Sequence, residues 1–299
     1  MKTFLLSDIR HRFRVALKDK YPPGEISNIF HLLTSHYFGF SKTLLAMEPQ
    51  KALDPEGAEQ LMDALEMLIE SVPVQYITGK AFFMDMDLQV SPAVLIPRPE
   101  TEELVRWILQ AHPPAPLSIL DIGTGSGCIA LGLKKGWPQA AVFAMDLSPW
   151  ALDVARGNAR VLQLDIEFRQ DDIRNPGQPW PEFEIIVSNP PYVPAGDRES
   201  MEPHVAESEP EVALFVPDED PLCIYRDILD FATHHLKPGG WVYLEIYEAF
   251  GKQVCDLLRQ AGFINIDLKK DIFGKDRFVR GQYPGRASRE DTAGANKKS

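Results

Sequence analysis

Residues 1–75 are expected to fold as a small helical bundle. Their apolar side chains recur every three or four positions, the spacing that places side chains on one face of a helix. The run Tyr21-Pro22-Pro23-Gly24 breaks the first helix, and helix starts are predicted at Ser41 and at Asp54-Pro55. The buried faces are predicted to contain Leu6, Ile9, Phe13, Leu17, Ile26, Ile29, Phe30, Leu33, Leu61, Leu65, Leu68 and Ile69.

The spacing of apolar residues then changes to every second position, and residues 76–100 are predicted to form a β-hairpin and a Pro-rich connector. Apolar and polar residues alternate from Met84 to Val90, which indicates a strand with one wet face. Three prolines between residues 92 and 99 punctuate the segment that follows. This connector is expected to join the bundle to a larger unit.

From residue 101 to 285, short apolar strands alternate with amphipathic helices. Strands are predicted at 118–122, 141–145, 166–169, 184–187, 241–246, 263–269 and 277–281. Helices are predicted at 104–109, 128–135, 148–162, 224–236 and 253–260. Such alternation implies an α/β fold with a mostly parallel, Rossmann-like sheet covered on both faces. The last two strands are expected to form a terminal antiparallel hairpin, and residues 286–299 a disordered tail.

Composition and charge narrow the classes of function. The hydrophobic fraction of 44% and the charged fraction of 25% are ordinary for a globular protein. No apolar run approaches the ~18 residues of a membrane helix, so no membrane association is expected. The formal net charge is −12, and a protein that binds nucleic acid through phosphates needs a basic surface. Direct contact with nucleic acid is therefore not expected.

Cysteine and histidine usage points to a reducing compartment and to no metal site. Cys128, Cys223 and Cys255 are far apart and odd in number, so no disulfide framework is predicted and a cytoplasmic location is expected. The seven histidines show no metal-ligand spacing. The one dense basic stretch, between Arg10 and Lys20, is interpreted as a solvated helix face or as a contact with an acidic or ribosome-bound partner.

A candidate ligand site begins with a glycine-rich loop after the predicted strand at 118–122. The loop reads Gly123-Thr124-Gly125-Ser126-Gly127, and glycines there let the backbone turn tightly and approach a ligand closely. Asp146 ends the next predicted strand, where an acid can accept hydrogen bonds from ribose hydroxyls. Asp172 and Ile173 follow the third strand, where Asp146 and Asp172 can bracket an adenine. These residues are predicted to bind a nucleoside.

The same loop argues against phosphate-bearing cofactors. Cys128 stands where the G-x-G-x-x-G pattern needs its last glycine, and no Gly-Lys-Ser/Thr sequence follows. The loop is therefore neither a pyrophosphate fingerprint nor a P-loop. A nucleoside without phosphates fits better, and S-adenosylmethionine is the common one.

A second loop carries the candidate chemistry. Asn189-Pro190-Pro191-Tyr192 follows an apolar strand end, and ligands in such sheets bind beyond the carboxyl ends of the strands. A planar amide or aryl-amine nitrogen carries two N–H donors, and the Asn189 side-chain oxygen and the Pro190 carbonyl can accept one each. Two prolines stiffen the loop, and Tyr192 offers a flat face to a planar group. The loop is predicted to bind and orient such a nitrogen for methyl transfer.

The chain resembles the release factor glutamine methyltransferases, the HemK/PrmC family, over residues 72–283. The resemblance rests on the glycine-rich loop, the Asn189–Tyr192 loop and several further motifs. The further motifs are Pro73-Val74-Gln75-Tyr76-Ile77-Thr78-Gly79, Leu95-Ile96-Pro97-Arg98-Pro99-Glu100-Thr101-Glu102, Glu209-Pro210 with Ala213-Leu214, and Lys237-Pro238-Gly239-Gly240. At Tyr247 and Phe250 the chain departs from the family pattern, where we expect a glycine and a glutamine.

The resemblance implies S-adenosylmethionine as methyl donor and the glutamine of a Gly-Gly-Gln loop in peptide chain release factors as acceptor. It implies that residues 123–127 and Asp146 bind the cofactor and that Asn189–Tyr192 bind the glutamine. Residues 1–75 would then dock the release factor. Two alternatives stay open at this point: an N6-adenine or N2-guanine methyltransferase acting on DNA or RNA, and a non-catalytic module that binds S-adenosylmethionine or a nucleotide.

Overall fold

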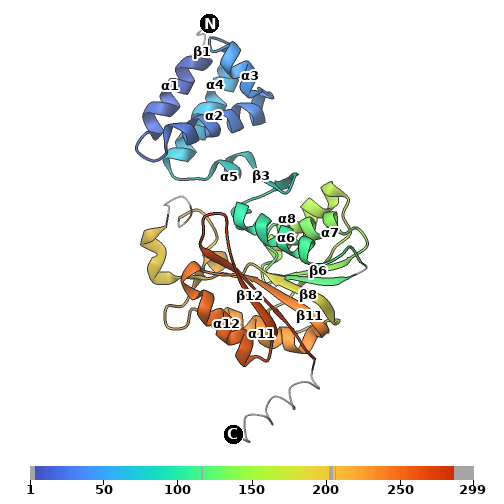
Figure 1. The fold of residues 1–299 in the computed structure, drawn as a ribbon. Coiled ribbons are helices and arrows are strands. Elements are labelled where there is room, and N and C mark those ends of the chain that lie inside the picture. The colour runs from blue at the N-terminus through green and yellow to red at the C-terminus, as the bar shows by residue number, and fades with distance from the viewer. Residues whose placement is uncertain (1–3, 116, 202–204, 206, 286–299) are drawn as a thin grey trace, which may run out of the picture. The chain divides into compact units, whose positions relative to one another are not determined.

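The computed structural model describes residues 4–115, 117–201, 205 and 207–285, and the chain divides into two compact units (Figure 1). Unit 1 comprises Met1–Lys80 and Met201–Ser208. Unit 2 comprises Ala81–Ser200 and Glu209–Ser299. The tail predicted at 286–299 lies outside the described residues. No helix among the described residues is long and apolar enough to cross a membrane.

Unit 1 is built from helices around one apolar core. Its elements are β1 (Phe4–Leu5), α1 (Leu6–Leu17), α2 (Pro23–Phe38), α3 (Lys42–Met47), β2 (Ala52–Leu53), α4 (Pro55–Ile69) and α5 (Val74–Thr78). Ser41 and Asp54 cap α3 and α4, since their side chains accept hydrogen bonds from the backbone N–H groups of Leu44 and Gly57. The predicted apolar faces are buried, except that Ile69, the last residue of α4, is 45% exposed.

The sequence did not indicate three of the elements in unit 1. The β1–β2 antiparallel pair has two residues per strand, which is too short for a periodic pattern. Helix α5 spans little more than one turn and ends at Gly79, whose φ of 68° is left-handed.

The connector contains the expected hairpin, with a shifted strand boundary. It consists of β3 (Lys80–Phe83) and β4 (Met86–Gln89). The strand predicted from Met84 starts two residues later, because Met84 and Asp85 adopt positive φ angles and form the turn. Helix α6 (Pro99–Ala111) follows the prolines.

Unit 2 contains the predicted mostly parallel sheet. Its seven strands are ordered β12-β13-β11-β8-β5-β6-β7. Their bounds are β5 (Ser118–Ile122), β6 (Ala141–Asp146), β7 (Glu167–Gln170), β8 (Phe183–Ser188), β11 (Leu236–Glu245), β12 (Ile264–Lys270) and β13 (Asp276–Gln282). Strand β13 pairs antiparallel with both β11 and β12, which confirms the terminal hairpin.

Helices cover both faces of this sheet (Figure 1). Helices α6, α7 (Cys128–Gly136) and α8 (Pro149–Leu162) pack on one face, and α11 (Cys223–His235) and α12 (Gly251–Gln260) on the other. Side chains of one strand alternate between the two cores: Ile119 lies in the first, whereas Leu120 and Ile122 lie in the second. Burial on both faces explains why these strands are continuously apolar.

Four parallel strands bring the candidate site to one edge. Strands β5, β6, β8 and β11 run in the same direction, so their carboxyl ends meet there. Beyond β8 the chain forms small elements that the sequence did not predict. These are β9 (Val193–Pro194), η1 (Ala195–Ser200), α10 (Glu211–Leu214) and β10 (Phe215–Val216), with η2 (Glu248–Phe250) after β11.

Candidate functional site

The glycine-rich loop between β5 and α7 has the conformation that its sequence predicts. Gly123, Gly125 and Gly127 all adopt positive φ, at 70°, 56° and 83°, where other residues are strained. A Cβ added at Gly123 or Gly125 would meet no atom within 4 Å, so space lies open beside the loop. At Gly127 it would lie 3.2 Å from Ala155 and Leu131, which shows that this glycine serves close packing.

Asp146 joins the loop to the end of β6. One carboxylate oxygen accepts from the Gly125 N–H at 2.8 Å and the other from the Ser148 N–H at 2.9 Å. Burial raises the pKa of Asp146, although these backbone hydrogen bonds oppose the shift. Each carboxylate oxygen can accept more than one hydrogen bond. Asp146 therefore holds the loop and retains capacity for ligand hydroxyls.

Asp121, at the end of β5, is a second buried acid under the same loop. One of its oxygens accepts from the Thr124 hydroxyl at 2.6 Å and from the Ala130 N–H at 3.2 Å, which caps the start of α7. Its Oδ1 atom is buried and has no partner among the described residues. Burial raises the pKa of Asp121 to about 7.

The remaining predicted cofactor residues differ in what their side chains can offer. Thr124 and Ser126 are 4% and 3% exposed, and the Thr124 hydroxyl already donates to Asp121. Asp172 lies two residues beyond β7 and forms an ion pair with Arg174 at 2.9 Å. Ile173 packs at the margin of the core beside α11. The roles of these four residues stay predictions.

The Asn189 side chain is held by a chain of hydrogen bonds that ends on a buried carboxylate. Its Nδ2 atom donates to the Thr101 hydroxyl at 3.1 Å, and that hydroxyl donates to Glu245 at 2.8 Å. Thr101 lies in the first turn of α6 and Glu245 at the end of β11. Because the Asn189 nitrogen points toward Thr101, the side-chain oxygen of Asn189 points away from Thr101 and is not used in this hydrogen bond.

Tyr192 is held by the same carboxylate. Its hydroxyl donates to the other oxygen of Glu245 at 3.1 Å. Its ring lies beside Tyr247, with centroids 6.2 Å apart, and Tyr247 lies 5.4 Å from the ring of Phe250. The stretch that departs from the family pattern thus extends the aromatic surface of the Asn189–Tyr192 loop.

Burial determines the proton affinities around Glu245. Burial raises the pKa of Glu245 to about 7. The hydrogen bonds from Thr101 and Tyr192 and the nearby charge of Arg277 lower the pKa, but burial outweighs them. Burial and the Glu245 charge raise the pKa of Tyr192 well above its ordinary value, so its phenol stays a donor. Burial also raises the pKa of the Cys128 thiol to about 12, which makes that cysteine a poor nucleophile.

An ion pair with a buried carboxylate also supports the loop. An Arg98 Nη2 atom lies 2.6 Å from Glu209, whose side chain is fully buried, and the same carboxylate accepts from the Ile96 N–H at 3.3 Å. Glu209 directly precedes the segment of α10 and β10. This segment pairs with β9, and the Leu214 carbonyl accepts from the Tyr192 N–H at 3.2 Å. Arg98 therefore connects the start of α6 to the Asn189–Tyr192 loop.

The residues at this edge suit a nucleoside-bearing cofactor. Open space beside two glycines, the remaining acceptor capacity of Asp146 and the unpartnered oxygen of Asp121 together offer shape and acceptors for hydroxyl and ammonium groups. Among the described residues, no group of three or more metal-ligating side chains occurs. The site can bind S-adenosylmethionine at the glycine-rich loop and present an acceptor at Asn189.

Three residues of the site carried signals that our sequence interpretation did not use. Thr101 is polar on the apolar face that Leu104, Val105 and Ile108 form, and a polar residue on such a face needs a buried partner. Glu245 ends its strand as Asp146 does, and Asp121 is the residue before the end of its strand.

Two family models and several named proteins are similar to this chain. The PrmC N-terminal domain model matches residues 8–79, and the methyltransferase small domain model matches residues 102–207. The release factor glutamine methyltransferase of Flavobacterium psychrophilum is 40% identical over 92% of this chain and 98% of that protein. The one from Bacteroides thetaiotaomicron is 41% identical over 89% of this chain and 96% of that protein.

A solved structure gives the same fold. The 16S rRNA N2 G1207 methyltransferase from T. thermophilus, in complex with AdoMet and guanosine, has a TM-score of 0.51. It is 18% identical, and the match covers 68% of this chain and 49% of that chain. At this identity the likeness concerns the fold alone, and it confirms the Rossmann-like sheet.

The raised pKa of Glu245 predicts a pH-dependent contribution to stability. Because the folded-state pKa, about 7, exceeds the ordinary 4.5, this contribution is fully present below about pH 4.5 and is lost as pH rises through 7. Glu245→Gln should remove it. Urea unfolding at about pH 5 and pH 8 should show the variant gaining up to roughly 3 kcal/mol relative to the wild type between the two pH values. Parallel pH profiles of the two proteins would contradict the assignment.

Proposed function

The chain belongs to the release factor glutamine methyltransferase family, and we propose that it transfers a methyl group from S-adenosylmethionine to a side-chain amide nitrogen of its substrate. The acceptor is the glutamine of the Gly-Gly-Gln motif in peptide chain release factors. The observation that carries this proposal is the hydrogen-bond chain from Asn189 through Thr101 to Glu245. This chain fixes the direction in which the side-chain oxygen of Asn189 can accept a hydrogen bond.

The acceptor group follows from that direction. A glutamine amide presents two N–H donors, and the Asn189 oxygen and the Pro190 carbonyl are the two acceptors that we assign to them. An ionised glutamate carries only hydrogen-bond acceptors. It could therefore form no hydrogen bond with the Asn189 oxygen or the Pro190 carbonyl. A site built around such a pattern can reject the mismatched analogue by ~10⁴–10⁵.

The remaining residues of the loop orient the amide. Tyr192, tied to Glu245 and bordered by Tyr247, offers an aromatic face against which the planar amide can lie. Pro190 and Pro191 limit the motion of the backbone. Glu245 contacts Thr101 and Tyr192, so it is a positioning residue. Orientation of bound reactants is worth roughly 7–11 kcal/mol of barrier in principle.

The cofactor is assigned to the glycine-rich loop. Residues 123–127 and Asp146 would hold S-adenosylmethionine, with Asp146 accepting from hydroxyl groups and Asp172 and Ile173 beside the base. When bound, S-adenosylmethionine supplies a sulfonium methyl group as the electrophile. The protein contributes binding and orientation of the nucleophile beside it.

A nucleobase acceptor is less well supported. N6-adenine and N2-guanine methyltransferases share the Asn-Pro-Pro-Tyr type of loop, but their substrates carry phosphates. The net charge of −12 repels such substrates. The relatives that match over most of the chain are named for a protein glutamine. A release factor substrate would also suit the expected cytoplasmic location.

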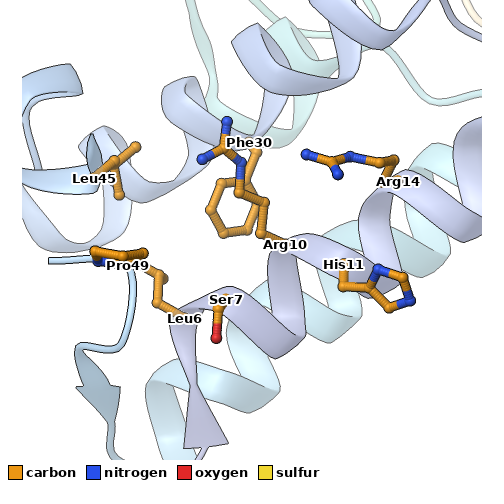
Figure 2. Close-up of a pocket in the computed structure, with 8 residues that line it drawn as sticks. All are labelled: Leu6, Ser7, Arg10, His11, Arg14, Phe30, Leu45 and Pro49. Carbon is orange, nitrogen blue, oxygen red and sulfur yellow. The ribbon is translucent and has the colours of Figure 1, made fainter. Parts of the chain in front are cut away.

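We assign the docking of the release factor to the helical unit, residues 1–75. Its surface has a cavity of about 260 Å³ between α1 and the following helices (Figure 2). Leu6, Phe30, Leu45 and Pro49 supply apolar lining, and Arg10 and Arg14 extend over it.

The chemistry of this cavity favours a protein segment with acidic and apolar residues. In the described part of the chain, neither Arg10 nor Arg14 forms an ion pair, so both guanidinium groups can meet carboxylates of a partner. Phe30 is 1% exposed and offers little surface for stacking a base, whereas an apolar side chain can fill the space above it.

Loss of the Asn189 acceptor should remove most activity without unfolding the protein. We expect Asn189→Ala to lower the single-turnover rate by roughly 10²–10³, the scale of losing one preorganised hydrogen bond. Mass spectrometry of a purified release factor, incubated with enzyme and S-adenosylmethionine, should place one added methyl group on the Gly-Gly-Gln glutamine. A Gln→Glu release factor should receive none. Methylation of adenine or guanine in nucleic acid, with release factors untouched, would reject the proposal.

Thr101 should affect rate more than binding. Thr101→Val keeps the shape of the side chain but removes the acceptor that orients Asn189, so we expect kcat to fall by about 10- to 100-fold. The Kd for S-adenosylmethionine should not change, and Thr101→Ser should restore the rate. Thr233→Val is the matched control, because it removes a buried hydroxyl that donates to the Asp230 carbonyl within α11. Equal rates for Thr101→Val and wild type would exclude the positioning role.

Docking at the cavity should depend on two particular positive charges. We expect Arg10→Glu with Arg14→Glu to raise the KM for a release factor by roughly 10-fold and to leave a Gly-Gly-Gln peptide unaffected. Arg12→Glu with Lys18→Glu makes the same change of charge on two exposed residues that do not line the cavity, Arg12 within α1 and Lys18 directly after its end. Equal effects of the two double variants would show that net charge, and not this cavity, is responsible.

A further inference from the structure

The turn between β12 and β13 holds two large apolar side chains in the solvent. Ile272 is 73% exposed and Phe273 is 69% exposed. Single exposed apolar residues are common on protein surfaces, but two adjacent ones on a protruding turn form a compact apolar tip. We call Ile272 and Phe273 the hairpin tip.

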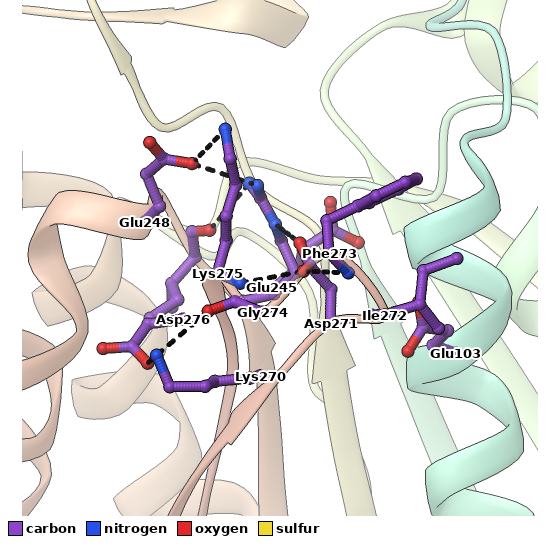
Figure 3. A network of polar contacts seen from close by, with 12 residues as sticks. Glu103, Glu245, Glu248, Lys270, Asp271, Ile272, Phe273, Gly274, Lys275 and Asp276 are labelled. Carbon is purple, nitrogen blue, oxygen red and sulfur yellow. Dashed lines mark hydrogen bonds and ion pairs between the residues drawn. The ribbon is translucent and has the colours of Figure 1, made fainter.

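A buried carboxylate makes the backbone of this turn rigid (Figure 3). Asp271 accepts from the backbone N–H groups of Phe273 at 2.9 Å and Lys275 at 3.0 Å, and from Arg277 Nε at 3.1 Å. Gly274 supplies the positive φ, 81°, that the turn requires. Burial raises the pKa of Asp271, but these hydrogen bonds outweigh it and the net pKa is lowered. The Asp271 carboxylate, which is charged and hydrogen-bonded to the turn, thus holds the hairpin tip in its exposed position.

Two further contacts fix the turn to its neighbours. Glu248 lies 2.7 Å from Lys275 and 3.6 Å from Arg277, which ties the turn to η2. The Ile272 N–H donates to Glu103 in α6 at 3.2 Å. Because the backbone of the turn is already fixed by these contacts, it loses little conformational freedom when a partner binds the hairpin tip.

The hairpin tip lies at the edge of the sheet that carries the Asn189–Tyr192 loop. Strand β13 pairs antiparallel with β11, and Phe278 lies opposite Glu245, so the turn before β13 is beyond the same edge as Glu245. Glu103, which accepts from the tip, is two residues from Thr101 in α6. The tip and the Asn189–Tyr192 loop therefore lie beyond the same edge of the sheet.

We propose that the hairpin tip is a contact surface for the protein substrate, binding an apolar patch of the release factor next to its Gly-Gly-Gln loop. This inference rests on the proposed function. Two of the three residues in that motif have no side chain, so contacts outside the motif must supply the affinity. Rigid, exposed apolar anchors beside a binding site are the type of residue that supplies it.

The test compares a whole release factor with a short Gly-Gly-Gln peptide, using the full-length enzyme. Ile272→Ser with Phe273→Ser should raise the KM for the release factor at least ~10-fold with little change in kcat. The kinetics on the peptide, which is too short to reach the tip, should not change. Ile272→Val with Phe273→Leu should restore the wild-type KM.

A matched control removes apolar surface from the opposite end of the sheet, away from the turn between β12 and β13. Val161, near the end of α8, and Ile264, at the start of β12, are 63% and 46% exposed, and their double replacement by serine should not change the KM. An unchanged KM for the tip variant would overturn the inference while wild-type activity persists. If the wild type methylates neither release factor nor peptide, the proposed function itself fails.

Discussion

Once a chain leaves a parallel strand, its backbone N–H groups lose the partners that the sheet provided, and a buried loop needs other acceptors. In unit 2 those acceptors are carboxylates. Asp146 holds Gly125 and Ser148, Asp121 holds the start of α7, and Glu209 holds Ile96. The positions of both the glycine-rich loop and the Asn189–Tyr192 loop depend on acids of this kind.

Burying these acids has an electrostatic cost, which appears as raised proton affinity. The pKa of both Asp121 and Glu245 is raised to about 7 by desolvation. Such a cost is characteristic of functional sites. In its ionised form Glu245 can only accept, so Thr101 must donate to it and must accept from Asn189. A weak nucleophile such as an amide nitrogen benefits from this fixed geometry, because orientation provides much of the rate.

The sequence predicted the fold well because its signals were periodic or local. Strand and helix alternation predicted the sheet and its covering helices, and the caps Ser41 and Asp54 were correctly identified. The strands β1, β2, β9 and β10 were not predicted, because two-residue strands have no period, and η1, α10 and η2 span at most six residues, too few for a helical pattern. The site was predicted in part: both loops were found, but Thr101 and Glu245 are separated by 144 positions, and no local pattern indicates their contact. Glu209 was noted within a motif, and only the structure shows that it pairs with Arg98.

The order of strands in the sheet also bears on how the protein is made. Strand β13, the last of the described strands, lies between β11 and β12 and is paired with both, so the sheet is complete only when β13 has left the ribosome. Contacts between distant positions form late in folding because their loop closure is costly. Glu245 belongs to this late set. A nascent chain can therefore fold its helical unit early yet remain inactive until β13 has left the ribosome.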